Sequence, residues 1–170
     1  MTNKVAHVLA KSFNDAGARA VRFNFRGVGA SAGVHAEGLG ETDDALAVLD
    51  WAAGRWPEAR LSLAGFSFGG AVAIRAAAQR PIERLVTVAP AVQRVNIVDA
   101  GRLPTCPWLL VQGDRDELVN VDAVKRWVQE VRPAPELQVL PGVDHFFHGR
   151  LNDLRAVVVR WLARAAGSDE

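Results

Sequence analysis

The sequence has almost no cysteine, since Cys106 is the only one in 170 residues. A single cysteine cannot form an internal disulfide. Cys106 stands close to Pro104 and Pro107, with no second cysteine or histidine at the spacing of metal ligands. We therefore expect Cys106 to be a small buried apolar residue in a protein of a reducing compartment, the cytoplasm. We expect no metal ion or other cofactor.

An excess of charge of one sign is also lacking. Twenty Lys and Arg residues against nineteen Asp and Glu residues leave a formal charge of +1, without a basic block that would neutralise a row of phosphates. No nucleic-acid partner is therefore expected. No apolar run reaches the length of about 18 residues that spans a bilayer, and none of about 7 to 15 residues follows Lys4 as in a signal peptide. We expect a soluble protein without a membrane partner.

What the sequence does contain is apolar residues in quantity, 49% of a 170-residue chain. This length suits one well-packed domain and is short for two. There is no internal repeat, low-complexity tract or linker. We expect residues 1–170 to form a single domain with one core.

Amphipathic segments alternate with short apolar runs along the chain. Gly17 is placed to end the first helix, and Thr42 or Asp43 to cap the second. Apolar strands separated by amphipathic helices predict an α/β fold, with a parallel sheet covered on both faces and active groups at the strands' carboxyl ends. The expected helices cover residues 3–17, 41–55, 68–80, 121–131 and 151–166, and the expected strands cover residues 19–25, 59–66, 83–90, 107–113 and 135–142.

The glycine-rich stretch RGVGASAG, residues 26–33, follows the first expected strand as a dinucleotide-binding loop would. Such a loop needs its last glycine to open a helix, so that backbone N–H groups point at the pyrophosphate. Gly33 is instead followed by VHAEGLG before any helix begins. The pattern favours a structural turn over a nucleotide site.

The stretch GFSFG, residues 65–69, places a serine where an expected strand changes into a helix. G-x-S-x-G in this context is typical of a nucleophile elbow, in which Ser67 adopts a strained backbone conformation. Gly65 and Gly69 are expected there because a Cβ at either position would collide in so tight a turn. The positive end of the helix that starts at Phe68 would favour an alkoxide or an oxyanion. A serine that only caps a helix fits the same residues.

A serine hydroxyl is a weak nucleophile at neutral pH, so Ser67 needs a histidine to take its proton and a carboxylate to orient that histidine. In this architecture the acid precedes the histidine along the chain. Asp114, Asp116 and Glu117 follow the expected strand 107–113. Asp116 is the preferred orienting acid, because Asp114 lies closer to the strand end and can fix the loop by bonding backbone N–H groups.

Two histidines follow the expected strand 135–142. His145 comes first and is the predicted base, whereas His148 lies nearer the last helix and could cap it or pack on it. Taken singly, each residue is more typical of a loop surface. The order Ser67, Asp116, His145 at three strand ends is what favours a catalytic triad.

The chain resembles the small, lidless bacterial α/β-hydrolases related to the dienelactone-hydrolase group. The resemblance covers nearly all of residues 3–165 and implies the α/β-hydrolase fold. It does not indicate the substrate, because that superfamily includes esterases, thioesterases, peptidases and lactonases. The stretches that carry it are RFNFRGVGASAG, LAGFSFGG, LLVQGDRDELV and PGVDHFFHGRL.

By this resemblance Ser67 is the nucleophile, Asp116 the triad acid and His145 the base, and the backbone N–H of Phe68 is one donor of the oxyanion hole. We expect a serine hydrolase that acts on small-molecule esters or related acyl compounds. The alternative is a catalytically silent member of the fold that serves as a binding or scaffolding protein.

Two segments carry further expectations. Only residues 91–106 stand where larger relatives insert a helical cap, so the site should be open. Relatives that the chain resembles begin with three more strands, whereas this sequence opens on the helix that normally follows them. We therefore expect an N-terminally shortened version of a longer protein, poorly stable and weakly active as written, whose coding sequence continues in frame upstream of Met1.

Overall fold

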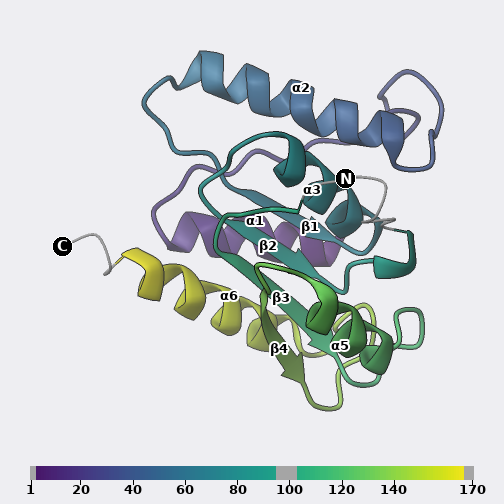
Figure 1. Ribbon diagram of the computed structural model, residues 1–170. Coiled ribbons are helices and arrows are strands. Elements are labelled where there is room, and N and C mark those ends of the chain that lie inside the picture. Colours follow the sequence, from purple (N-terminus) through teal and green to yellow (C-terminus); the bar gives the residue numbers. More distant parts are fainter. Residues whose placement is uncertain (1–2, 95–102, 167–170) are drawn as a thin grey trace.

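The computed structural model describes residues 3–94 and 103–166 (Figure 1). Regular elements alternate along the chain as the sequence predicts. The helices are α1 (Lys4–Asp15), α2 (Leu39–Arg55), α3 (Phe68–Gln79), the short 3-10 helix η1 (Val92–Arg94), α5 (Val121–Glu130) and α6 (Leu151–Ala166). The strands are β1 (Leu63–Phe66), β2 (Leu85–Val88), β3 (Trp108–Gly113) and β4 (Glu136–Leu140).

The four strands form one sheet in the order β1-β2-β3-β4, with every neighbouring pair parallel. Leu85 of β2 pairs with Leu63 of β1 and with Trp108 of β3. In a parallel sheet all carboxyl ends lie at the same edge, so the loops that follow the strands gather there. This confirms the predicted parallel sheet for four of the five expected strands and sets the place of the candidate site.

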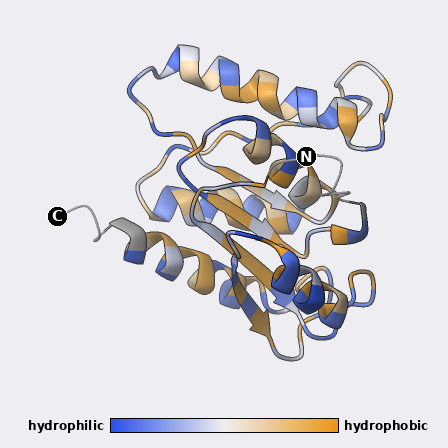
Figure 2. Ribbon diagram, in the orientation of Figure 1, coloured by the Kyte–Doolittle hydropathy of each residue, from blue (hydrophilic) through white to orange (hydrophobic). Residues whose placement is uncertain are grey.

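Helices cover both faces of the sheet, with α1 and α6 on one side and α3 and α5 on the other (Figure 1). The strands of the sheet are largely hydrophobic (Figure 2). Side chains alternate along β2 and β3 between two apolar clusters. The cluster beneath α1 and α6 takes Val86, Val88, Leu109 and Val111 from these strands. The cluster beneath α3 and α5 takes Leu85, Trp108 and Leu110. In the described part of the chain, no helix is long and apolar enough to cross a membrane.

Cys106 lies beside the second of these clusters. Its side chain is half-buried and packs against the apolar residues beneath α3 and α5. Burial raises the pKa of the Cys106 thiol, because the thiolate is poorly solvated there. The thiol thus packs as a small apolar group, as the sequence predicts.

The predicted strand over residues 19–25 is wrong. This segment joins no ladder, and β1 pairs on one side only, with β2, within the described residues. A strand exists only where a neighbour completes its backbone hydrogen bonds, so β-type side chains alone do not make one. Phe23 and Phe25 instead pack against the cluster between α2 and α3. Their two rings meet edge to face, with 5.3 Å between the ring centroids.

The predicted cap of the second helix is also wrong. Helix α2 begins at Leu39, and Gly38 stands at the N-cap with φ +97°. Thr42 donates its hydroxyl to the Gly38 carbonyl within the first turn. The capping group is the carboxylate of Glu41, which accepts hydrogen bonds from the N–H of Ala36 at 2.9 Å and of Gly38 at 2.7 Å. Glu41 is fully buried, so it fixes the loop that leads into α2.

Replacing Glu41 with glutamine is expected to destabilise the fold in a pH-dependent way. Burial by itself would raise the pKa of Glu41, but backbone N–H donors and the nearby His35 outweigh it, so the pKa is lowered. The carboxylate therefore stabilises the fold above the unfolded-chain value of about 4.3, and this contribution is lost as the pH falls through the lower folded value.

Urea unfolding should show Glu41→Gln less stable than the wild type by about 1–3 kcal/mol at pH 7, with a smaller difference at pH 3. The exposed Glu58→Gln serves as the matched control and should change little at either pH. A difference between wild type and Glu41→Gln that stays constant with pH would contradict this role of the carboxylate.

Candidate active site

Ser67 stands between β1 and α3 in the strained conformation that an elbow requires. Its φ is +51° and its ψ −116°, in a region that a residue with a Cβ rarely adopts. The surrounding backbone holds it there. The Ser67 N–H donates to the carbonyl of Val88 at 2.9 Å, and the Ser67 carbonyl accepts from the N–H groups of Gly70 at 3.0 Å and Ala71 at 3.2 Å.

The glycines of the elbow differ in importance. A Cβ on Gly65 would overlap the backbone carbonyl of Gly69, so only glycine fits at that position. The expectation that a Cβ on Gly69 would also collide is wrong, because such a Cβ would meet nothing nearer than the Phe25 ring at 3.8 Å. Gly70 is the second constrained position, since a Cβ would lie 3.1 Å from Pro90.

The structure brings Ser67, Asp116 and His145 together at the carboxyl ends of β1, β3 and β4. The Nε2 atom of His145 lies 3.0 Å from the Ser67 Oγ, and its Nδ1 atom lies 2.8 Å from the Asp116 Oδ2. His145 is 1% exposed and Asp116 9%. Water therefore competes little for the Asp116–His145 hydrogen bond, and the imidazole is oriented toward the hydroxyl.

Asp116 is held on both of its oxygens. Its Oδ1 accepts from the N–H groups of Leu118 at 2.9 Å and Val119 at 2.7 Å. Its Oδ2 accepts from Gln112 Nε2 at 2.9 Å in addition to facing His145. The carboxylate cannot turn without breaking several bonds, so the histidine has a fixed partner.

The other acids near the site make different contacts. Asp114 Oδ1 accepts from the N–H of Gly142 at 2.6 Å, which ties the loop after β3 to the turn after β4. Glu117 Oε2 accepts from the backbone N–H of His145 at 3.3 Å. Neither carboxylate contacts the imidazole in the described structure. The Asp114 contact is the loop-fixing role that the sequence predicts for it.

His148 does not reach Ser67. Its Nδ1 atom contacts Asp144 Oδ2 at 2.8 Å, and its N–H donates to Asp144 Oδ1 at 3.0 Å. These hydrogen bonds from the backbone and ring of His148 lower the pKa of Asp144. The His148 side chain is 75% exposed, so the pair lies at the surface of the loop. In residues 3–94 and 103–166, no three His, Cys, Asp or Glu side chains gather to hold a metal ion.

Aromatic rings line the site around the imidazole. The Phe66 and Phe146 rings each lie 5.0 Å from the His145 ring, and Phe146 is 46% exposed. The chain reverses at Phe147, whose φ is +57°, so that Phe147 enters the core while Phe146 faces outward. An apolar wall thus stands beside the His145 imidazole.

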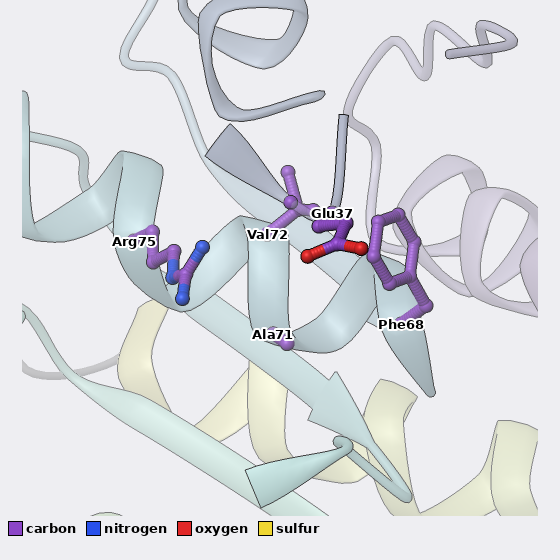
Figure 3. A pocket seen from close by; sticks show the side chains of 6 residues that line it. Glu37, Phe68, Ala71, Val72 and Arg75 are labelled. Carbon is purple, nitrogen blue, oxygen red and sulfur yellow. The ribbon is translucent and has the colours of Figure 1, made fainter. Parts of the chain in front are cut away.

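Phe68 opens α3, and its N–H belongs to the helix's first turn, where N–H groups lack partners within the helix. The centroid of the Phe68 ring lies 5.9 Å from that of the Phe25 ring and 5.2 Å from that of the His35 ring. A shallow pocket on this side of α3 lies between the Phe68 ring and Arg75, with Glu37 over it (Figure 3). None of the triad residues lines this pocket, and its one residue in common with the candidate site is Phe68.

Two residues of the site are not predicted from the sequence. Gly70 follows the G-x-S-x-G pattern, and its constraint comes from Pro90, which the strand β2 brings near. Gln112 lies in a strand that is otherwise apolar, WLLVQG, and a polar residue in a fully buried strand is the signal that could have found it. Such a side chain must have a hydrogen-bond partner, which here is Asp116.

A serine on a strained strand-to-helix turn, with a histidine and an acid after later strands of the same parallel sheet, defines an α/β-hydrolase. The chain belongs to the α/β serine hydrolases: residues 2–104 match the family described as serine aminopeptidase, S33. A Rickettsia prowazekii protein, RP471, is 34% identical over 171 residues, an alignment that covers 95% of this chain and 72% of that protein.

Two solved structures are similar in both fold and sequence. An alpha-beta serine hydrolase homologue from Coxiella burnetii is 42% identical with a TM-score of 0.90, over 94% of this chain and 76% of that one. XC6422 from Xanthomonas campestris, described as a serine hydrolase without a lid, is 41% identical with a TM-score of 0.90, over 96% of this chain and 74% of that one. The predicted resemblance and fold are confirmed.

Proposed function

We propose that this protein cleaves carboxylic esters or related acyl compounds of small-molecule substrates through an acyl-enzyme on Ser67. The observation that carries the proposal is the continuous hydrogen-bonded line from Asp116 through His145 to the Ser67 hydroxyl, at 2.8 Å and 3.0 Å. A hydroxyl at this distance from a buried, oriented imidazole can lose its proton as it attacks a carbonyl.

In the acylation step the Ser67 Oγ bonds to the carbonyl carbon while His145 Nε2 takes the hydroxyl proton. The carbonyl oxygen gains negative charge, and in this proposal the Phe68 N–H donates a hydrogen bond to it, supported by the position of Phe68 at the positive end of α3. His145 then gives its proton to the oxygen of the leaving alcohol as the bond between the carbonyl carbon and the alcohol oxygen breaks. The acyl group remains on Ser67.

In the deacylation step a water molecule takes the place of the alcohol. His145 removes a proton from the water, whose oxygen bonds to the acyl carbon, and the proton is returned to the Ser67 oxygen as the acid leaves. Asp116 keeps its charge throughout and stabilises the imidazolium that forms in both steps. The Phe66 and Phe146 rings offer an apolar surface to the acyl or alcohol group.

Hydrolysis of p-nitrophenyl acetate by the purified protein tests this proposal. Turnover that disappears in Ser67→Ala is the expected result, because that variant keeps the fold and lacks the nucleophile. Equal rates in the two proteins would point to the silent binding protein that the sequence leaves as the alternative.

Short acyl chains are expected to be turned over faster than long ones. The prediction rests on the short connection 91–106, in which residues 95–102 lie outside the described part of the chain. The Xanthomonas relative is described as lacking a lid. Without a deep apolar tunnel a long acyl tail gains little from burial. A p-nitrophenyl ester series should show kcat/KM falling from acetate or butyrate toward laurate, and a strong preference for chains of about twelve carbons would contradict an open site.

A further inference from the structure

Gln112, near the end of β3, lies directly beneath the proposed acid. Its side chain is fully buried, and its Nε2 donates to Asp116 Oδ2 at 2.9 Å and to the Val119 carbonyl at 3.1 Å. Asp116 Oδ2 is also the oxygen that His145 Nδ1 contacts at 2.8 Å. Two donors therefore share one carboxylate oxygen, and one of them is the proposed base.

The orientation of the Gln112 amide is fixed by its neighbours. Turning it over would place its oxygen against the carboxylate of Asp116 and the carbonyl of Val119, both of which are acceptors. In the present orientation Oε1 is a buried polar atom that has no hydrogen-bond partner in the described structure. A buried acceptor without a donor costs free energy, which an apolar residue in this otherwise apolar strand would avoid.

We propose that Gln112 is a positioning residue of the triad, acting on His145 through Asp116; the inference rests on the proposed function. Its N–H holds Asp116 Oδ2 toward the imidazole and draws negative charge away from that oxygen. The imidazolium is then less strongly favoured, so His145 becomes available as a base at lower pH. A residue without the donor leaves more charge on Oδ2 and keeps the proton on the imidazole to higher pH.

Other charged groups near His145 could also affect the pH dependence of activity, so the test must leave them unchanged. Glu117 accepts from its backbone N–H at 3.3 Å. The Asp144–His148 pair sits on the same loop, with Phe146 between the His145 and His148 rings. A substitution at Gln112 leaves all of these in place, so a change in pH dependence reports on the bond to Asp116.

The test compares Gln112→Met with Gln138→Met. Methionine matches the glutamine in length and lacks the donor. Gln138 is a half-buried residue of β4 that also donates to a carboxylate, Glu136 Oε1, at 3.1 Å, outside the site. The measurement is kcat/KM for p-nitrophenyl acetate against pH, together with Tm. Gln112→Asn, whose amide is one methylene too short to reach Asp116, provides a second variant should the methionine form fail to fold.

We expect Gln112→Met, or Gln112→Asn, to lower kcat/KM by about 10- to 100-fold at pH 7 and to move the acid limb of the profile to higher pH, while Gln138→Met does neither. An unmoved acid limb, even with lower activity and Tm, would overturn the role of Gln112 and leave the triad standing. A wild-type protein without serine-dependent turnover would instead overturn the proposed function and this inference with it.

Discussion

Replacing Ser67 with alanine is expected to lower kcat by about four to six orders of magnitude while the protein stays folded. The Ser67 hydroxyl contacts His145 Nε2, and the elbow is held by backbone hydrogen bonds that alanine keeps. Loss of the His145 imidazole should reduce kcat to a similar level, because a nucleophile and its base act as one unit. Steady-state kinetics and thermal unfolding of both variants give the two measurements.

The matched control is Ser62→Ala, a serine just before β1 that lies outside the site. Its kcat should equal that of the wild type. A double variant without Ser67 and His145 should lose no more than either single variant. Additive losses would mean that the two residues act separately, and the hydrogen bond between them would then have no catalytic meaning.

The second large effect is expected at Asp116. Asparagine would present an N–H group to His145 Nδ1, which favours the wrong tautomer of the imidazole, and kcat should fall by about 10⁴-fold. Asp114→Asn should act mainly on stability, because that carboxylate accepts from the Gly142 N–H and does not contact the imidazole in the described structure. Kinetics and urea unfolding of the two variants separate these outcomes.

The comparison has a clear contrary result. If Asp114→Asn lost more activity than Asp116→Asn at unchanged stability, the assignment of the orienting acid would be reversed. The contacts in the structure predict the opposite, since Asp116 is bonded on both oxygens and Asp114 lies at the exposed turn.

Most of the fold follows from sequence pattern because it depends on local chemistry. Helix α1 ends just before Gly17, whose φ is +85°, and the strands β2 and β3 are fully buried and apolar except at Thr87, Gln112 and Gly113. The order of Ser67, Asp116 and His145 at strand ends is also local information, since a parallel sheet brings all carboxyl ends to one edge.

Part of what the sequence pattern missed depends on contacts between distant segments. Residues 19–25 have strand-forming side chains, but a strand also requires a neighbour, and pairing is a property of the whole sheet. The crowding at Gly70 likewise comes from Pro90, which the fold brings near.

The cap from Glu41 is local, since its donors Ala36 and Gly38 lie five and three residues before it, but a search for Ser, Thr, Asp or Asn at the helix start does not find it. Gln112 lies only four residues before its partner Asp116, and their contact depends on how the turn after β3 folds back toward the strand end.

Labelling with a fluorophosphonate probe tests the central claim most directly, because the probe forms a stable adduct only with a serine that is activated as a nucleophile. Intact-protein mass spectrometry should show one adduct per chain, and peptide mapping should place it on Ser67. The adduct should be absent in Ser67→Ala and present in Ser62→Ala. No adduct on the folded wild-type protein, or the same adduct on Ser67→Ala, would contradict the account.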